Sequence, residues 1–224
     1  MPALFSRTSK LGCESISIPA TKCKTGSKLA KIKGSVCEGC HALNGAYTWP
    51  VVQRAMEYRL EYLQAIDVVP KMVAELNKKK NTFFRWFDSG DVQDVRMALN
   101  IIDICEATPN KKYWIPTKER KIWQDALKIK ALPDNAVIRY SAHMVDQAPP
   151  EKWEHSSAVI TDVFQAIGKL CKAYRTKKNG DMITDKEFQT AKKERKIGKL
   201  DLGHCGNCRD CWSPAVKTVS YPQH

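Results

Sequence analysis

The amino-acid sequence predicts an α/β fold with a mainly parallel sheet. Short apolar segments alternate along the chain with longer segments whose apolar residues recur at helical spacing. Strands that alternate with helices are typical of strand–helix–strand units, which place helices outside a parallel sheet. Polar sequences follow several of the strand-like segments, at the ends where such folds bind ligands. These observations favour an open sheet or a partial β/α barrel.

Each expected element follows from the local sequence. The expected strands are residues 15–19, 82–87, 112–117, 136–141 and 157–161. The expected helices are residues 49–66, 68–77, 92–106, 118–129 and 185–196. Pro50 suits the first turn of the first helix, and Asp67 can cap the second. Thr184 and Glu187 form a capping box ahead of the last.

We expect a single domain over residues 1–224, built from three parts. Residues 1–48 hold the first strand and a long loop with cysteines. Residues 49–165 form the β/α core, and residues 166–224 form a basic, cysteine-rich C-terminal segment. Long loops inside compact domains are uncommon, and are usually functional or disordered. The cysteines in the N-terminal loop favour a function for it.

Composition limits the compartment and the class of protein. The 224 residues are 43% hydrophobic and 27% charged, as in ordinary globular proteins. No apolar stretch approaches the roughly 20 residues that cross a bilayer, and the first residues lack the apolar core of a secretory signal. We therefore expect a cytoplasmic protein with no membrane partner. In that reducing compartment, nine cysteines favour metal binding over disulfides.

Positive charge gathers in one segment. The chain carries a formal net charge of +13, and residues 169–199 hold 11 Lys and Arg against 4 Asp and Glu. Such a stretch can neutralise phosphates, so a nucleotide or a nucleic acid is one expected partner. A solvated, lysine-rich face is the other interpretation. The sequence leaves both interpretations open.

The spacing of the cysteines predicts a metal centre. The stretch GHCGNCRDCW places Cys205, Cys208 and Cys211 three residues apart, and VCEGCH holds a similar turn at Cys37 and Cys40. Such a turn lets two thiolates reach one metal ion or two irons of a cluster. The triple spacing is more typical of iron–sulfur proteins, although the fourth cysteine of the ferredoxin run is missing. Zinc held by two Cys-x-x-Cys pairs is the alternative.

Two further cysteines raise the question of one centre or two. Cys23 precedes the first pair in the same loop, and Cys171 precedes the C-terminal three. Two centres would divide the ligands into Cys23, Cys37 and Cys40 in one set, and Cys171, Cys205, Cys208 and Cys211 in the other. A single centre would join the first pair to two of the C-terminal cysteines. We favour two centres, because seven clustered cysteines exceed the needs of one four-ligand site.

The polar residues after the strands are candidates for ligand binding. Asp88 could bind a hydroxyl or an amine of a cofactor, whereas Asp91 is expected to cap the helix that follows. Lys118 and Arg120 could hold an anionic group, or could simply begin a solvated helix. His143 is either a proton carrier or a structural residue.

The remaining cysteines, histidines and tryptophans have weaker expectations. Cys105 is expected to be buried in the core, and Cys13 is assigned no role. Trp212 could shield a cluster from solvent. The histidines that could replace a thiolate ligand are His41, His204 and His224. The tryptophans expected in the core are Trp49, Trp86, Trp114 and Trp123.

Six stretches in a fixed order resemble one known family. They are SISIPATKC, VCEGCHALNGAY, FRWFDSGD, YWIPTKER, IRYSAH and CGNCRDCWSPAVKTVSYPQH. In this order they resemble the phage-encoded gene product 88 family of cysteine-rich proteins, over nearly the whole chain. The resemblance implies a phage protein in the cytoplasm of the infected host cell, and it brings no assigned reaction. His41 stands where the family usually has a tyrosine.

The cysteines also resemble, more weakly, those of radical S-adenosylmethionine enzymes. In these partial β/α barrels, three cysteines after the first strand hold a [4Fe–4S] cluster whose fourth iron binds S-adenosylmethionine. Many add a C-terminal auxiliary cluster. The resemblance implies the first role for Cys23, Cys37 and Cys40, and the auxiliary role for the C-terminal set. Two features depart from the pattern. Thirteen residues separate Cys23 from Cys37, where three are usual, and only DSGD, with Asp88, stands in place of the glycine-rich motif.

Two functional hypotheses follow from these features. The first is an iron–sulfur protein with one or two [4Fe–4S] clusters that performs radical or redox chemistry on an unknown substrate. The second is a non-enzymatic module in which zinc or a saturated cluster staples the long loop to the C-terminus. Its basic face would bind nucleic acid or a host protein. Binding of S-adenosylmethionine distinguishes the first hypothesis from the second.

Overall fold

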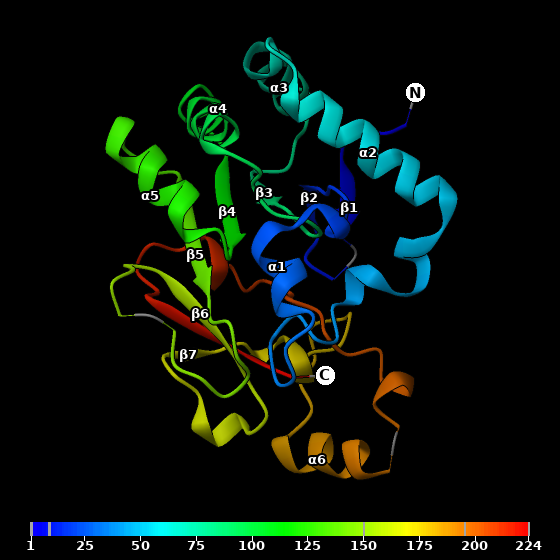
Figure 1. The fold of residues 1–224 in the computed structure, drawn as a ribbon. Coiled ribbons are helices and arrows are strands. Elements are labelled where there is room, and N and C mark those ends of the chain that lie inside the picture. Colours follow the sequence, from blue (N-terminus) through cyan, green and yellow to red (C-terminus); the bar gives the residue numbers. More distant parts are fainter. Residues whose placement is uncertain (1, 9, 150, 195, 224) are drawn as a thin grey trace.

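The fold is a mixed α/β arrangement around one sheet (Figure 1). The computed structural model describes residues 2–8, 10–149, 151–194 and 196–223. The strands lie in the order β1–β2–β3–β4–β5–β6–β8–β7. Their bounds are β1 Ser6–Thr8, β2 Cys13–Ile16, β3 Phe83–Trp86, β4 Lys112–Thr117, β5 Ala136–Ser141, β6 Ser156–Ile160, β7 Lys169–Leu170 and β8 Thr218–Pro222. Among the described residues only the pair β1–β2 is antiparallel, so the mainly parallel sheet is confirmed; it does not close into a barrel.

The helices follow the expected starts closely. Their bounds are α1 Lys24–Leu29, α2 Pro50–Gln64, α3 Val68–Asn77, α4 Val95–Glu106, α5 Arg120–Ile129 and α6 Asp185–Lys193. α2 begins at Pro50, and the capping box of Thr184 and Glu187 precedes α6, both as predicted. Asp67 precedes α3 but pairs with Lys71 instead of capping the helix. None of the helices formed by the described residues is long and apolar enough to cross a membrane.

The start of α4 corrects one expectation. The helix was expected from residue 92 with Asp91 as its cap, but it begins at Val95. Its cap is Asp94, whose side chain accepts a hydrogen bond from the Met97 N–H at 2.8 Å. Asp91 is buried and its carboxylate contacts the end of β4 instead, so its assignment as the cap is wrong.

Pairing between distant segments creates elements that local sequence did not predict. The strands β1 and β7 have only three and two residues, and β8 is held between β6 and β7. Residues 20–48, expected to be a loop, contain α1. The helix α6 ends at Lys193, before the expected end at Lys196. These short elements depend on tertiary contacts more than on propensity.

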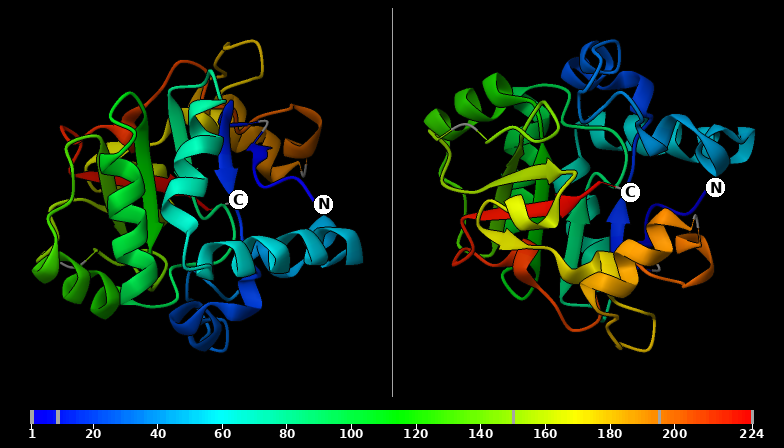
Figure 2. Two further views of the ribbon diagram at one scale, coloured as in Figure 1. Left: turned by 90° about the horizontal axis from the view of Figure 1, so that it is seen from above. Right: turned by 90° about the horizontal axis from the view of Figure 1, so that it is seen from below.

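Both faces of the sheet are covered (Figure 2). Along β4, Tyr113 and Ile115 belong to the core beneath α2–α5. Trp114 lies between them, points to the opposite face, and packs with Trp212 of the C-terminal segment. Parallel sheets are normally buried on both sides in this way. Here the helices cover one face, and the turn that carries Cys211 and Trp212 packs on the other.

The aromatic core follows the sequence prediction with one exception. Trp86 and Trp123 are fully buried between the sheet and the helices, and Cys105 is buried beside them, as expected. Trp114 is buried on the opposite face. Trp49 is 60% exposed, so its assignment to the core is wrong. It stands just before α2, where the chain leaves the N-terminal loop on the outside of the sheet.

Candidate functional site

A large cavity lies along the edge where the parallel strands end. Its volume is about 1160 Å³. Residues at or beyond the carboxyl ends of β2–β6 and β8 line it, including Asp88, Lys118 and Ala142 from the polar sequences expected there. The cysteines on its walls come from both parts of the chain and are Cys23, Cys37, Cys40, Cys171, Cys205 and Cys211. Ligand pockets commonly measure roughly 300–1,000 Å³, so this cavity can hold an organic molecule.

The three cysteines of the N-terminal loop share one wall of this cavity. We call Cys23, Cys37 and Cys40 the N-terminal cysteine group. α1 folds the chain back between Cys23 and Cys37. A methyl group built on Gly26 would stand 3.6 Å from the Cys23 Sγ and 3.7 Å from the Cys37 Sγ. The long gap in sequence therefore does not separate these thiols. Burial, and next the nearby Asp91, raise the pKa of Cys23 to about 12.

The loop that carries this group is tied to the strand ends. The Glu119 carboxylate accepts hydrogen bonds from the Thr25 N–H at 2.7 Å and from the Thr25 hydroxyl at 2.9 Å. The Val36 N–H donates to the His143 carbonyl at 2.9 Å. Glu119 is buried, and hydrogen bonds to an ionised acceptor are stronger than those between neutral groups. Glu119 is a positioning residue that sequence reasoning missed, although it stands within TKER.

Cations and a histidine lie beside the N-terminal cysteine group. Burial raises the pKa of the Cys37 thiol, and the Lys118 ammonium beside it opposes that rise. The Arg120 guanidinium lies over the Tyr140 ring, 4.6 Å from its centre. The His143 Nε2 is 3.3 Å from the Tyr140 hydroxyl, and burial with two nearby cations lowers the pKa of His143. Of these residues, Lys118 is the cation beside the Cys37 thiol.

The DSGD turn after β3 is tightly built. Gly90 has a φ of 84°, and a Cβ at this position would meet the Ile18 Cγ1 at 2.2 Å. Asp91 accepts hydrogen bonds from the Thr117 hydroxyl and from the Lys118 N–H, both at 2.8 Å. Burial raises the pKa of its carboxyl to about 6. Asp91 therefore joins the ends of β3 and β4.

Asp88 is engaged by two side chains. Its Oδ1 accepts a hydrogen bond from the Arg85 guanidinium at 2.6 Å, and its Oδ2 accepts one from the Tyr47 hydroxyl at 2.6 Å. It lines the large cavity between the two parts of the chain that carry cysteines. The role of Asp88 in cofactor binding stays a prediction, and its present contacts join β3 to the N-terminal loop.

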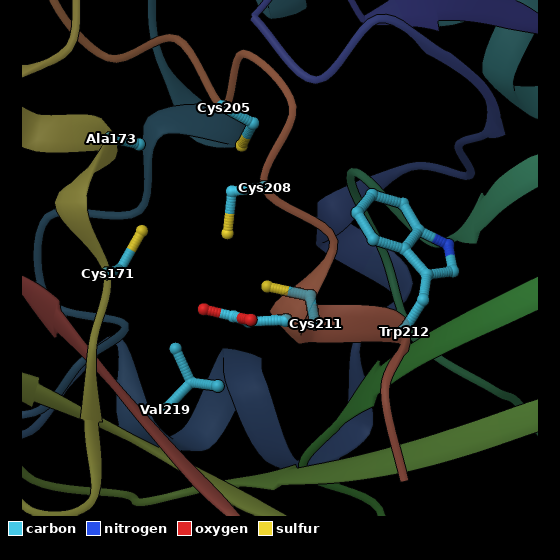
Figure 3. Close-up of a pocket in the computed structure, with 8 residues that line it drawn as sticks. Cys171, Ala173, Cys205, Cys208, Cys211, Trp212 and Val219 are labelled. Atoms are coloured by element: carbon cyan, nitrogen blue, oxygen red, sulfur yellow. The ribbon is translucent and has the colours of Figure 1, made fainter. Parts of the chain in front are cut away.

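Four cysteines of the C-terminal segment surround a second, small cavity. We call Cys171, Cys205, Cys208 and Cys211 the C-terminal cysteine group. Figure 3 shows their side chains directed toward a common space, with Trp212 and Val219 beside it. The cavity volume is about 20 Å³, which is room for about one water-sized group and excludes an organic ligand. Burial raises the pKa of Cys171 and of Cys205 to about 12.

A buried arginine donates hydrogen bonds to the backbone of the turn that carries Cys211. Arg139 on β5 is 0% exposed. Its guanidinium donates to the carbonyls of Cys211 at 2.9 Å, Asp210 at 2.8 Å and Ser213 at 2.9 Å. A longer bond of 3.3 Å reaches the Lys217 carbonyl. Sequence reasoning missed Arg139, although a charged residue inside the apolar strand AVIRYS was a signal that something polar faces it.

Trp212 anchors the same turn to the sheet. Its indole N–H donates to the Phe84 carbonyl at 2.9 Å. Its ring packs edge-on against Phe83 and Trp114, with centroid distances of 5.5 and 5.3 Å. Trp212 is buried and lines the small cavity. The expectation that it shields a cluster stays a prediction, and its position beside the thiols is the one such a role requires.

The thiols of each group line a common cavity but do not form a ready metal site. In the part of the chain that the structure describes, no group of three or more His, Cys, Asp or Glu side chains forms a ready site for a metal ion. Each cysteine group instead lines a space shared by its members. Cys171, Cys205 and Cys211 line both cavities, and whether the thiols serve one centre or two stays a prediction.

The remaining candidate ligands lie in varied settings. His41 follows Cys40 and lines the large cavity. His204 pairs with Asp201 at 3.1 Å through its Nε2. His224 lies outside the described residues. Cys13 is buried beside the C-terminal cysteine group and packs in the same apolar cluster as Trp212.

The basic residues 169–199 present many exposed side chains around α6. The exposed lysines of this segment are Lys169, Lys172, Lys178, Lys186, Lys192, Lys193, Lys196 and Lys199. Ion pairs engage a few of its cations, such as Lys196 with Glu194 at 2.7 Å. A binding role for the segment stays a prediction, because a solvated face would look the same.

Comparison with known families places the chain. A family model described as gene product 88 matches residues 3–214. The chain belongs to the gene product 88 family. The match includes both cysteine groups, so they belong to the part of the protein that defines this relationship. No curated protein and no solved structure matches the chain. The likeness to radical S-adenosylmethionine enzymes stays a prediction.

Proposed function

We propose that this gene product 88 family member is a phage iron–sulfur protein of the infected cell's cytoplasm. In this proposal it performs radical or redox chemistry on a molecule held in the large cavity. One observation carries the proposal: four thiols face a small cavity that is otherwise largely apolar (Figure 3). Cysteine thiolates are the usual protein ligands of [4Fe–4S] clusters, and four of them complete one cluster.

The surroundings of the C-terminal cysteine group fit a cluster. The Tyr221 hydroxyl lies 3.1 Å from the Cys211 Sγ, and Trp212 closes the space on another side. Hydrogen bonds to sulfur and exclusion of solvent are the means by which proteins tune a cluster's potential. A bound cluster would supply one-electron transfer. The protein's part is to hold it, shield it and set its potential.

The sequence spacing of the thiols is what favours iron over zinc at this group. Both metals accept four thiolate ligands. Cys205, Cys208 and Cys211 stand three residues apart, and this triple spacing is more typical of iron–sulfur proteins.

The N-terminal cysteine group supports a second cluster with a different role. Three thiolates leave one iron of a [4Fe–4S] cluster without a protein ligand. This group lines the large cavity, so an organic molecule can reach that iron. S-adenosylmethionine is the ligand we propose there. Gly26 lies against both Cys23 and Cys37, which answers the objection that their gap in sequence is too long.

A non-enzymatic module is the second candidate. The observation that favours it is the run of exposed lysines in residues 169–199, next to the C-terminal cysteine group. Zinc or a saturated cluster would then staple this segment to the sheet. The lysines would bind a nucleotide, a nucleic acid or a host protein. Binding to nucleic acid would weaken steeply as salt concentration rises.

Anaerobic purification from an iron-supplemented host tests the proposal. We expect a brown protein that absorbs broadly near ~400 nm and contains iron and sulfide in equal amounts. Titration with S-adenosylmethionine should then change the electron paramagnetic resonance signal of one reduced cluster and leave the other unchanged. A colourless protein with stoichiometric zinc and no sulfide would contradict the redox proposal and favour the module.

A further inference from the structure

A continuous chain of side-chain contacts links the two cysteine groups. It runs through Tyr221, Trp114, Arg85, Asp88 and Tyr47, which we call the connecting chain. Its members come from β8, β4, β3, the turn after β3 and the N-terminal loop. They therefore cross the sheet from the C-terminal cysteine group to the N-terminal one, along the wall of the large cavity.

The first contacts start at a thiol of the C-terminal cysteine group. The Cys211 Sγ lies 3.1 Å from the Tyr221 hydroxyl. The Tyr221 ring stacks on Trp114, with centroids 6.5 Å apart and planes at 28°. Both aromatic residues line the large cavity. Two large π systems thus extend from the sulfur toward the middle of the sheet.

The middle of the connecting chain is an ion pair. The Arg85 guanidinium lies over the Trp114 ring, 4.6 Å from its centre. Arg85 also pairs with Asp88 at 2.6 Å, and the two side chains are 19% and 18% exposed. Because their charges cancel, the link adds no net charge to the cavity wall. The Arg85 guanidinium therefore touches both the aromatic part and the carboxylate.

The last contacts reach the N-terminal cysteine group. The Asp88 Oδ2 accepts a hydrogen bond from the Tyr47 hydroxyl at 2.6 Å. The Tyr47 ring packs edge-on against His41, with centroids 5.3 Å apart. His41 follows Cys40 directly in the chain. No gap in contacts therefore remains between Cys211 and the residue bonded to Cys40.

We propose that the connecting chain carries single electrons between the centres held by the two cysteine groups. This inference rests on the proposed function, since it needs a cluster at each group. One electron leaves the C-terminal centre, which is oxidised, and reduces the N-terminal centre; no bond changes and no proton moves. An external one-electron donor restores the first centre. Cys208 is the exposed cysteine of its group, so that donor approaches there.

Continuous contact is what favours this route. Electron tunnelling slows steeply with each gap between atoms, and more steeply through empty space or water than through packed side chains. The large cavity lies between the groups, and its wall supplies the packed path. Removing the Trp114 ring interrupts the path, because it touches both Tyr221 and Arg85.

Pulse radiolysis of the iron-loaded protein tests the route. A pulse in formate solution generates the carbon dioxide radical anion, which is a one-electron reductant, in less than stoichiometric amount. We expect fast reduction followed by an internal phase whose rate does not depend on protein concentration. Freeze-quenched paramagnetic resonance spectra assign each phase to a cluster. Trp114→Leu should slow the internal phase by an order of magnitude or more. The matched control is Trp49→Leu, an exposed tryptophan outside the connecting chain, and it should leave the rate unchanged.

The possible results separate the two proposals. Wild-type protein without iron and sulfide would overturn both the proposed function and the electron route, and protein with a single cluster would overturn the route alone. Two clusters with an internal rate unchanged by Trp114→Leu would overturn the route alone. If Trp114→Leu does not fold, Tyr47→Leu replaces it, because Tyr47 lies in the partly exposed N-terminal loop. An unchanged internal rate in Tyr47→Leu would then overturn the route.

Discussion

The two cysteine groups differ in how completely the protein encloses them. The C-terminal cysteine group has four thiols around a small cavity, with the buried Arg139 and Trp212 behind it. The N-terminal group has three thiols on the wall of a cavity of about 1160 Å³. Its loop is held by Glu119, by the hydrogen bond between Tyr47 and Asp88, and by a few backbone bonds. A closed set of four suits a centre that only stores or passes electrons, whereas an open set of three suits a centre that meets a substrate.

Replacing Arg139 should destabilise the C-terminal cysteine group, which is the more enclosed of the two. Arg139→Met leaves several backbone carbonyls of the C-terminal turn without a donor. We expect the free energy of unfolding to fall by about 3–5 kcal/mol. Iron bound by the C-terminal group should be lost first. Urea unfolding and iron analysis measure both effects, with the exposed Arg54→Met as control. An unfolding free energy equal to that of the control would contradict this role.

A substitution in the DSGD turn should lower the free energy of unfolding almost as much. Gly90→Ala forces a Cβ against Ile18 and places alanine at a φ of 84°. The expected loss of unfolding free energy is about 2–3 kcal/mol, from overpacking and backbone strain. Gly39→Ala is the matched control, because a Cβ there meets no atom within 4 Å. Thermal unfolding of the two variants checks the difference, and equal melting temperatures would show that the turn tolerates the clash.

Weakening the hydrogen bonds that hold the N-terminal loop should affect the N-terminal cysteine group alone. Glu119→Gln removes the charge that accepts both Thr25 hydrogen bonds. The expected cost is about 2 kcal/mol, since hydrogen bonds to a charged group are worth about 1.5–3 kcal/mol. Iron on the N-terminal group should exchange faster with a chelator, and iron on the C-terminal group at the wild-type rate. Equally faster iron exchange at both cysteine groups would contradict the expectation that the two groups are held independently.

The thiol pKa values predict a smaller effect, in the metal-free protein. Burial raises the pKa of Cys23, Cys171 and Cys205 to about 12, from the ordinary thiol value of 9.0. Unfolded thiols then lose protons near pH 9 while the folded ones keep them. Stability is therefore full below pH 9 and falls as pH rises toward the folded pKa. The three together should cost about 1 kcal/mol at pH 9. Urea unfolding between pH 7 and pH 10 measures the slope; a flat profile would contradict the burial of these thiols.

Iron binding should reverse the sign of this pH dependence. Metal ligands must be thiolates, so loading releases protons and tightens as pH rises. Competition with a chelator at pH 7 and pH 9 checks this on the same preparation.

Periodicity was enough to predict the mainly parallel sheet. Alternating strands and helices predicted β3, β4, β5 and β6 with their helices, because those elements have strong local patterns. The cysteines that the spacing grouped line two cavities with three cysteines in common, and their binding of metal stays a prediction. The strand ends with DSGD and TKER do line one cavity, as parallel topology requires.

The residues that support the cysteine groups could not be predicted from local sequence. Arg139 and Glu119 act through partners 72 and 94 residues away. The pattern of its turn predicts a helix cap at Asp91, and only the approach of Thr117 and Lys118 assigns its carboxylate. The side-chain type predicts a core position for Trp49, but Trp49 precedes α2 and is exposed. Such roles depend on long-range packing, which spacing along the chain does not encode.

Iron content in single cysteine variants tests the two-centre account most directly. Cys205→Ala and Cys37→Ala, purified anaerobically beside wild type, each remove one ligand from one group. Cys105→Ala, which removes a buried core thiol, is the control and should keep all the iron. The account predicts that each of the first two variants retains about half of the wild-type iron and sulfide, since each breaks one of two clusters. Loss of all the iron from either variant would contradict it, because the thiols would then serve a single shared centre.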